Sequence, residues 1–398
     1  VSIKTVNSNE LEVAQYLEKL FNRYGIRSHI DTVTDGRANL IATVGSSQPV
    51  IGISGHMDVV SEGNHDHWTY DPFTLTEDQG YLYGRGAADM KSGLAALAIA
   101  LIEIKESGKL TQGTIKFMAT VGEEMEQSGS QQLFEKGYAD DLDALLIAEP
   151  SFPSLVYAHK GSMDFRIKSK GRASHSSLPF LGQNAIKPLL EFIQNINQEY
   201  EKITQSVKGE SLDFSNMINN LGSQLPNHIT KEKAQELIQG LVMTNSIVQG
   251  GTQVNSVPDF ATAEFNVRTI PEYNNNKVKA LFNEYIEQAN QNGASLTQEL
   301  YLDLEPVVTT GQNRLVELGF DIAKSHFSNE RDLIVTPTVA VTDASNLLKE
   351  KDENFPFLMF GPGNGPHQIN ECVEKANYLE FVEYYIEFIT SYLNEENE

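Results

Sequence analysis

Cysteine is nearly absent from this sequence. Its 398 residues include one cysteine, Cys372. A single thiol cannot form an intramolecular disulfide, which excludes the disulfide-stapled scaffolds typical of small secreted proteins. We therefore expect a cytoplasmic protein, made without a removed signal peptide.

Long apolar runs and basic residues are also scarce. The longest apolar stretches, residues 95–102 and 144–148, are shorter than the roughly 20 residues that a helix needs to cross a bilayer. Lys and Arg number 30 against 54 Asp and Glu, which gives a formal net charge of -24 at pH 7. This charge opposes binding to phosphate backbones and anionic lipids, so we expect neither nucleic acid nor a membrane as a partner. An anionic small molecule is not excluded, because a few buried cations can set the local potential.

The remaining composition is that of a globular protein. Hydrophobic residues make up 40% of the chain and charged residues 21%. The length exceeds the roughly 250 to 300 residues at which single cores stop growing, so two domains are expected.

Helices and strands alternate in the first part of the chain. Apolar spacing predicts helices over residues 10–24, 91–107 and around 123–135. Strands are predicted over residues 39–44, 50–54, 114–120 and 144–148. This alternation favours an α/β domain with a mostly parallel sheet covered on both faces.

After Pro150 the pattern changes. Strands predicted at 163–170 and 262–268 bracket a long stretch rich in Asn and Gln, of which 198–239 is expected to be helical. Helices and short strands resume near residue 312, and the chain ends in a predicted amphipathic helix. We expect a discontinuous first domain of residues 1–162 and 305–398, and an inserted α+β domain of residues 163–304.

Polar residues gather at or near the ends of the predicted strands. They are His56, Asp58, Asp89, Glu123, Glu124 and Glu149. Ligand sites of open α/β sheets form at the carboxyl ends of the strands, so these segments are expected to converge. Imidazole and carboxylate ligands without a thiolate suit zinc, cobalt or manganese. The neighbours Glu123 and Glu124 can divide metal binding from proton transfer, which favours metal-assisted amide hydrolysis.

Motifs along nearly the whole chain carry a family resemblance. They lie at residues 54–60 (SGHMDVV), 84–93 (GRGAADMKSG), 123–124, 148–150, 171–176 (GRASHS), 250–258, 266–268 and 366–371. In these segments the sequence resembles the zinc peptidase family of aminoacylase, carboxypeptidase G, acetylornithine deacetylase and succinyl-diaminopimelate desuccinylase. The resemblance implies a metal-binding catalytic domain, an inserted lid or dimerisation domain, a homodimer and two divalent metal ions. Zinc is the expected metal, and cobalt or manganese could replace it.

The resemblance also implies a ligand set. His56 and Glu149 would bind one metal, Glu124 and His367 the other, and Asp89 would bridge the two.

Other roles follow from the same resemblance. Glu123 would be the general base, and Asp58 would accept the second ring N–H of His56. His175 would reach across a dimer interface to stabilise the oxyanion, while Arg268 and Asn255 would anchor the substrate. The alternatives are a turn aspartate for Asp58, a turn-capping role for His175 and a structural ion pair for Arg268. Residues 342–344 are weaker substrate-contact candidates.

The expected activity is removal of an acyl group from an N-acyl amino acid. Succinyl-diaminopimelate is the first candidate substrate, which would place the enzyme in lysine and diaminopimelate biosynthesis. Acetylornithine deacetylase and a dipeptidase or aminopeptidase are the alternatives. A non-catalytic binding protein is disfavoured because Glu123 and all five ligands are present, and a two-metal phosphoesterase because no phosphate-cradling Gly loop occurs. The stretch 198–239 departs from the compact lid of typical bacterial desuccinylases.

Overall fold

The computed structural model describes residues 1–221, 225–226, 228–327, 332–363 and 365–394. The chain divides into two compact units. Unit 1 comprises Val1–Ala158, Thr309–Thr336 and Thr342–Glu398, and unit 2 comprises His159–Val308 and Pro337–Val341. We propose that unit 1 is the catalytic domain and unit 2 the lid domain.

Unit 1 is built on an eight-stranded sheet of order β1-β2-β6-β3-β7-β14-β8-β13. The strands are β1 (Arg27–Thr34), β2 (Arg37–Gly45), β3 (Val50–His56), β6 (Thr114–Thr120), β7 (Ala144–Pro150), β8 (Ser154–His159), β13 (Ile334–Thr338) and β14 (Phe357–Gly361). Strands β6, β3, β7 and β14 run parallel, while β2 pairs antiparallel with β1 and β6, and β8 antiparallel with β14. The predicted α/β class is confirmed, with a parallel centre and antiparallel flanks.

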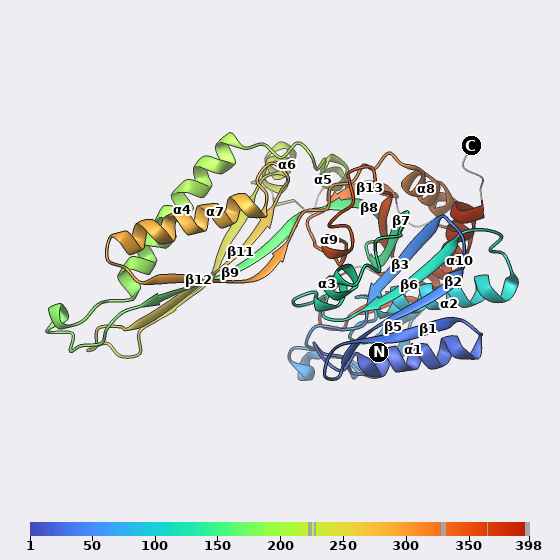
Figure 1. Cartoon of the computed structure of the whole chain (residues 1–398), viewed down its shortest axis with the longest axis horizontal. Helices are drawn as coiled ribbons and strands as arrows, with labels where there is room; N and C mark the ends of the chain where they lie inside the picture. The colour runs from blue at the N-terminus through green and yellow to red at the C-terminus, as the bar shows by residue number, and fades with distance from the viewer. Residues whose placement is uncertain (222–224, 227, 328–331, 364, 395–398) are drawn as a thin grey trace. The chain divides into compact units, whose positions relative to one another are not determined.

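Both faces of this sheet are covered. Helices α1 (Leu11–Arg23), α2 (Lys91–Ser107), α8 (Arg314–His326) and α10 (Lys375–Asn394) share one apolar core with the strands. Phe117 of β6 points into this core and meets Phe21 edge to face. Its neighbour Met118 points the opposite way and is also buried, because successive strand side chains alternate. Helices α3 (Ser128–Glu135) and α9 (Ala344–Leu347) lie beside each other in this unit (Figure 1).

One predicted helix begins later than expected, and another is confirmed. The helix expected around 123–135 begins only at Ser128, which leaves Glu123 and Glu124 in the turn before it. The C-terminal helix α10 is amphipathic as predicted: residues 376, 379, 383 and 387 form a narrow exposed edge, and the wide buried face packs against α2 and α8.

A small sheet joins two distant segments of unit 1. Its order is β15-β5-β4, with β4 at Thr76–Asp78, β5 at Tyr81–Tyr83 and β15 at Cys372–Glu374. The antiparallel pairing of β5 with β15 fixes the chain before Asp89 to the chain after His367.

Unit 2 contains a four-stranded antiparallel sheet of order β10-β11-β9-β12. These strands are β9 (Gly161–Lys170), β10 (Val242–Gly250), β11 (Phe260–Thr269) and β12 (Leu296–Leu304). Helices α4 (Ile186–Ser206) and α7 (Asn275–Gln291) pack on the sheet (Figure 1), where Phe165 stacks on Phe282 with ring centroids 4.3 Å apart. The expected helical stretch 198–239 contains the end of α4, α5 (Ser215–Leu221) and α6 (Lys231–Gln239). Within it, residues 222–224 and 227 lie outside the described residues.

Short 3-10 turns occur at His65–His67 and Pro179–Leu181. Among the described residues no helix is both long and apolar enough to cross a membrane.

Gly93 lets α2 approach β7 directly. A Cβ atom at residue 93 would lie 2.0 Å from the backbone oxygen of Ala148, immediately before Glu149. We predict that Gly93→Ala lowers the free energy of unfolding by about 1 to 3 kcal/mol, because the helix and strand must move apart. Chemical denaturation measures this change. Ser107→Ala, an exposed site on the same helix, is the control, and equal stability of the two variants would contradict the prediction.

Candidate active site

His56 ends the central strand β3 and is buried. Its Nε2 atom lies 3.1 Å from Asp89 Oδ1 and 3.5 Å from Glu149 Oε1. Glu149 is part of the neighbouring parallel strand β7, and Asp89 lies just before α2. Three segments thus bring an imidazole and two carboxylates together at one end of the sheet.

Asp89 connects this group with a second one. His367 Nε2 lies 3.3 Å from Asp89 Oδ2 and 2.9 Å from Glu124 Oε2. The two oxygens of Asp89 therefore face two different imidazoles. The ligand atoms of His56, Asp89 and Glu124 lie within 4.8 Å of one another, as do those of His56, Glu123 and Glu149.

Asp58 orders both the histidine and the glutamate turn. The Nδ1–H of His56 has its nearest acceptor in the backbone oxygen of Asp58, at 3.0 Å, while the carboxylate Oδ1 is 3.7 Å away. The Asp58 carboxylate instead accepts the backbone N–H groups of Glu123 at 3.2 Å and Glu124 at 3.1 Å. Asp58 thus orients His56 chiefly through its carbonyl and the Glu123–Glu124 turn through its side chain.

Glu371 holds the turn that carries Asp89. One oxygen of this buried carboxylate accepts the backbone N–H groups of Ala88 at 2.8 Å and Asp89 at 3.0 Å. Its other oxygen forms a buried ion pair with Arg85. The residue that follows His367 by four positions therefore fixes the backbone of Asp89.

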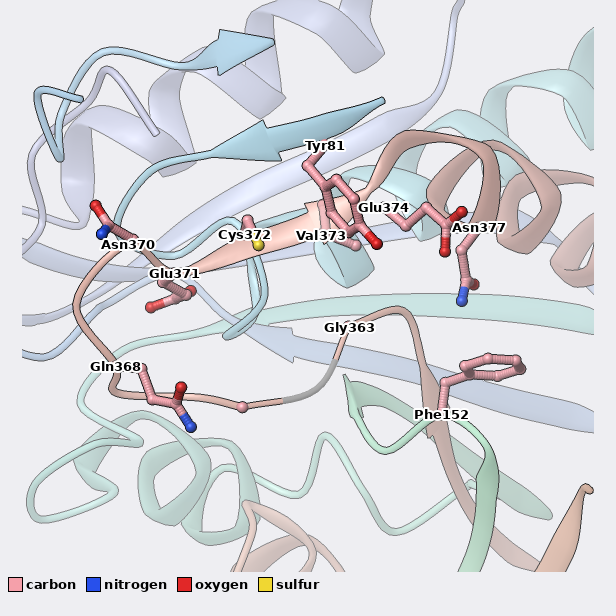
Figure 2. A pocket seen from close by; sticks show the side chains of 11 residues that line it. Tyr81, Phe152, Gly363, Gln368, Asn370, Glu371, Cys372, Val373, Glu374 and Asn377 are labelled. Carbon is pink, nitrogen blue, oxygen red and sulfur yellow. The ribbon is translucent and has the colours of Figure 1, made fainter. Parts of the chain in front are cut away.

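A cavity of about 280 Å³ lies beside Glu371 (Figure 2). Glu371, Cys372 and Asn377 are among its lining residues, but the candidate metal ligands are not. Burial raises the pKa of the Cys372 thiol, which agrees with a structural role for this cysteine.

The charges of the cluster fit divalent cations. Four carboxylates, those of Asp89, Glu123, Glu124 and Glu149, surround two imidazoles with side chains at most 10% exposed, except for His367. Buried carboxylates are costly unless positive charge compensates them. Oxygen and imidazole donors are those that zinc, cobalt and manganese accept.

Proton binding shows the same demand for positive charge. Burial raises the pKa of Glu149 to about 8, and burial with the nearby Glu149 charge raises the pKa of Glu123 well above its ordinary value. Hydrogen bonds to Asp89 and Glu124 raise the pKa of His367 to about 10. Burial would lower the pKa of His56, but the surrounding carboxylates raise it overall. A metal that displaces these protons would supply the same compensation.

The three remaining predicted site residues lie in unit 2. His175 and Asn255 are exposed neighbours, because Ser176 N–H donates to the Asn255 oxygen at 3.0 Å. Arg268 lies near the other end of β11 and pairs in register with Ser162 of β9. The structure therefore brings His175 and Asn255 together, and leaves Arg268 apart from them.

Sequence reasoning gave no role to Gln127 and Thr120, which lie close to the cluster. Gln127 donates from Nε2 to Glu123 Oε1 at 3.0 Å, and Thr120 Oγ1 lies 2.5 Å from Asp343 Oδ2. Burial raises the pKa of Asp343 to about 6. Glu371 had a sequence signal, its place in the motif 366–371, but nothing in the sequence pairs it with Arg85.

Comparisons with known proteins agree with this geometry. Residues 52–391 match the family described as Peptidase family M20/M25/M40. A Staphylococcus aureus (strain MRSA252) protein named probable succinyl-diaminopimelate desuccinylase is 44% identical over 397 residues, covering 99% of this chain and 96% of that protein.

Solved structures share the fold. An M20 family metallo-carboxypeptidase from Sulfolobus solfataricus has a TM-score of 0.81 at 19% identity, covering 98% of this chain and 97% of its own. A dinuclear metal-binding M20 peptidase from Bacillus subtilis has a TM-score of 0.63 at 17% identity, covering 98% and 95%. The chain therefore belongs to the peptidase family M20/M25/M40 and is a metal-dependent hydrolase of that family.

Proposed function

We propose that the protein is a cytoplasmic, zinc-dependent succinyl-diaminopimelate desuccinylase of lysine and diaminopimelate biosynthesis. The observation that carries the reaction type is the double imidazole–carboxylate cluster around Asp89. The substrate rests on the 44% identity, over 99% of the chain, to a protein named for that activity. Acetylornithine deacetylase and a dipeptidase remain the alternatives.

The proposed ligands follow the two halves of the cluster. His56 and Glu149 would hold one zinc ion, Glu124 and His367 the other, and the two oxygens of Asp89 would face one ion each. When bound, two such ions polarise the amide oxygen and lower the pKa of a water molecule.

Glu123 is the proposed proton carrier. Its Oε2 atom lies 4.0 Å from His56 Nε2, so this oxygen faces the cluster. In hydrolysis the carboxylate takes a proton from the attacking water and passes it to the leaving amine nitrogen. The products are a free carboxylate and a free amine.

We predict that Glu123→Gln lowers kcat by at least about 100-fold, because a positioned general base contributes on the order of 100- to 10,000-fold. Metal content, measured by elemental analysis, should stay at the level of the parent. Glu126→Gln changes an exposed glutamate in the same turn and should retain activity. Full turnover by Glu123→Gln would exclude this mechanism.

Substrate choice is tested by a turnover panel. Succinyl-diaminopimelate, acetylornithine, other N-acyl amino acids and dipeptides are each assayed with zinc, cobalt or manganese present. We predict the highest kcat/KM for succinyl-diaminopimelate, and loss of its hydrolysis on chelation with recovery on adding metal. Preference for another member of the panel would replace the proposed substrate, while hydrolysis of none would refute the proposed function.

The distance between Arg268 and the pair His175 and Asn255 within unit 2 supports a homodimer. Arg268 stands eight residues after Phe260 on β11, which corresponds to about 26 Å of extended chain, and His175 and Asn255 lie beyond the Phe260 end. One small substrate cannot span that length within a single chain. Near His175 and Asn255, Phe180 is 76% exposed and Val254 is 99% exposed, as expected of a surface that a second copy covers. His175 and Asn255 would then serve the site of the partner.

Mixed dimers test this arrangement. Glu123→Gln and His175→Ala chains are each expected to be inactive, yet their heterodimer contains one site with both native residues. With random exchange, half of the dimers are mixed, so we predict recovery of about a quarter of the parental activity. Verified heterodimers without activity would show that His175 does not act across the interface.

A further inference from the structure

The proposed proton carrier is held by one buried amide. Gln127 is 1% exposed, and its Nε2–H donates to Glu123 Oε1 at 3.0 Å. The other oxygen, Oε2, is the one that faces His56. The amide therefore occupies one carboxylate oxygen and leaves the second directed at the metal cluster.

The backbone of Gln127 is unusual for a residue with a long side chain. Its φ of 52° and ψ of 35° are left-handed, a conformation that glycine adopts more readily than residues with a Cβ atom. Its N–H donates to the Gly122 oxygen at 2.6 Å, which closes the turn that carries Glu123 and Glu124. Unfavourable backbone conformations of this kind gather at functional sites. A glutamine at a position whose backbone conformation suits glycine better indicates that the side-chain amide is needed there.

A second amide determines which way Gln127 faces. Asn346 of α9 directs Nδ2 at Ser130 Oγ, 3.1 Å away, and at Gln127 Oε1, 3.4 Å away. Because Asn346 presents a donor, it favours the acceptor end of the Gln127 amide on its own side. The donor end then points to the Glu123 carboxylate. Asn346 follows residues 342–344, which the sequence analysis named as weaker substrate-contact candidates.

We propose that Gln127 is a positioning residue for Glu123, and that Asn346 sets the orientation of the Gln127 amide. Together they fix the carboxylate by Oε1 and present Oε2 as the proton acceptor. This inference rests on the proposed hydrolase function. Neither amide is one of the proposed metal ligands or substrate anchors.

The test replaces Gln127 by methionine, which keeps the volume but removes the donor. We expect kcat to fall about 10- to 100-fold, since a displacement near 1 Å can cost on the order of 100-fold. KM should stay within about twofold of the parent, because substrate binding is not affected. Metal content and melting temperature should also match the parent. Asn346→Leu should give the same pattern with a smaller loss.

A matched control lies on α3, the helix that begins directly after Gln127. Gln131 Nε2 donates to Glu135 Oε1 at 2.9 Å, which repeats the glutamine–glutamate pairing at an exposed place. Gln131→Met should leave kcat unchanged. Unchanged kcat in Gln127→Met would overturn the proposal, and so would a loss of kcat that accompanies lost metal or a lowered melting temperature.

Gln127→Gly separates positioning from folding. Glycine removes the backbone strain together with the amide, so we expect low kcat in a protein that still folds and binds metal. Parental kcat in this variant would overturn the proposal.

Crystal structures of metal-loaded parent and Gln127→Met supply a readout that needs no substrate. We expect Glu123 Oε2 to face the metals in the parent and the carboxylate to rotate or split into two orientations in the variant. An identical single orientation would overturn the proposal, even for a protein that hydrolyses none of the assayed amides. A parent active on the panel together with an unchanged variant would refute the positioning role alone.

Discussion

Repulsion among buried carboxylates is the constraint on which unit 1 depends. Asp89, Glu123, Glu124 and Glu149 share one small volume with two histidines. Their charges require compensation, and burial raises the pKa of both Glu123 and Glu149 for this reason. Cations that bind here would displace protons. The carboxylates must therefore be held close together even before a cation binds. The fold therefore has to hold these carboxylates close together against their mutual repulsion.

The fold supplies this order through backbone clamps. Asp58 accepts two successive N–H groups at residues 123–124, and Glu371 accepts two at residues 88–89. Each clamp fixes the main chain of a segment that carries a proposed metal ligand, without using the oxygens of that ligand. The parallel register of β3 and β6 also positions His56, because it places this residue opposite Thr120. The positions of the proposed ligands are thus set by hydrogen bonds to backbone groups, which use none of the proposed ligand oxygens.

Some of these features could be predicted from the sequence, and others could not. The helix at 91–107 and the strand at 114–120 were predictable because each is a largely apolar segment whose length, 17 and 7 residues, suits a buried helix and a buried strand. Convergence of His56 and Glu149 was predictable because parallel strands end at one edge. The Arg85–Glu371 pair joins residues 286 positions apart, and no local pattern encodes it.

The left-handed backbone of Gln127 was equally hidden, because glycine or asparagine is the usual signal for that conformation. The same limit applied to residues 198–239, whose short helices and connecting loops carry only weak apolar periodicity. What the sequence left open was therefore the set of long-range contacts, not the type of chemistry.

Basic side chains lie close together near one end of β11 in unit 2. Burial lowers the pKa of His159 to about 4 and of Lys160 to about 8, and the nearby Arg268 contributes to both shifts. Three basic side chains thus gather at one end of β11 in a protein with a net charge of -24. Arg268 is the proposed anchor of the substrate, and its guanidinium group suits a bidentate grip on a carboxylate. Under the proposed function, substrate anchoring and metal binding would therefore depend on different residues, those near this end of β11 and those around Asp89.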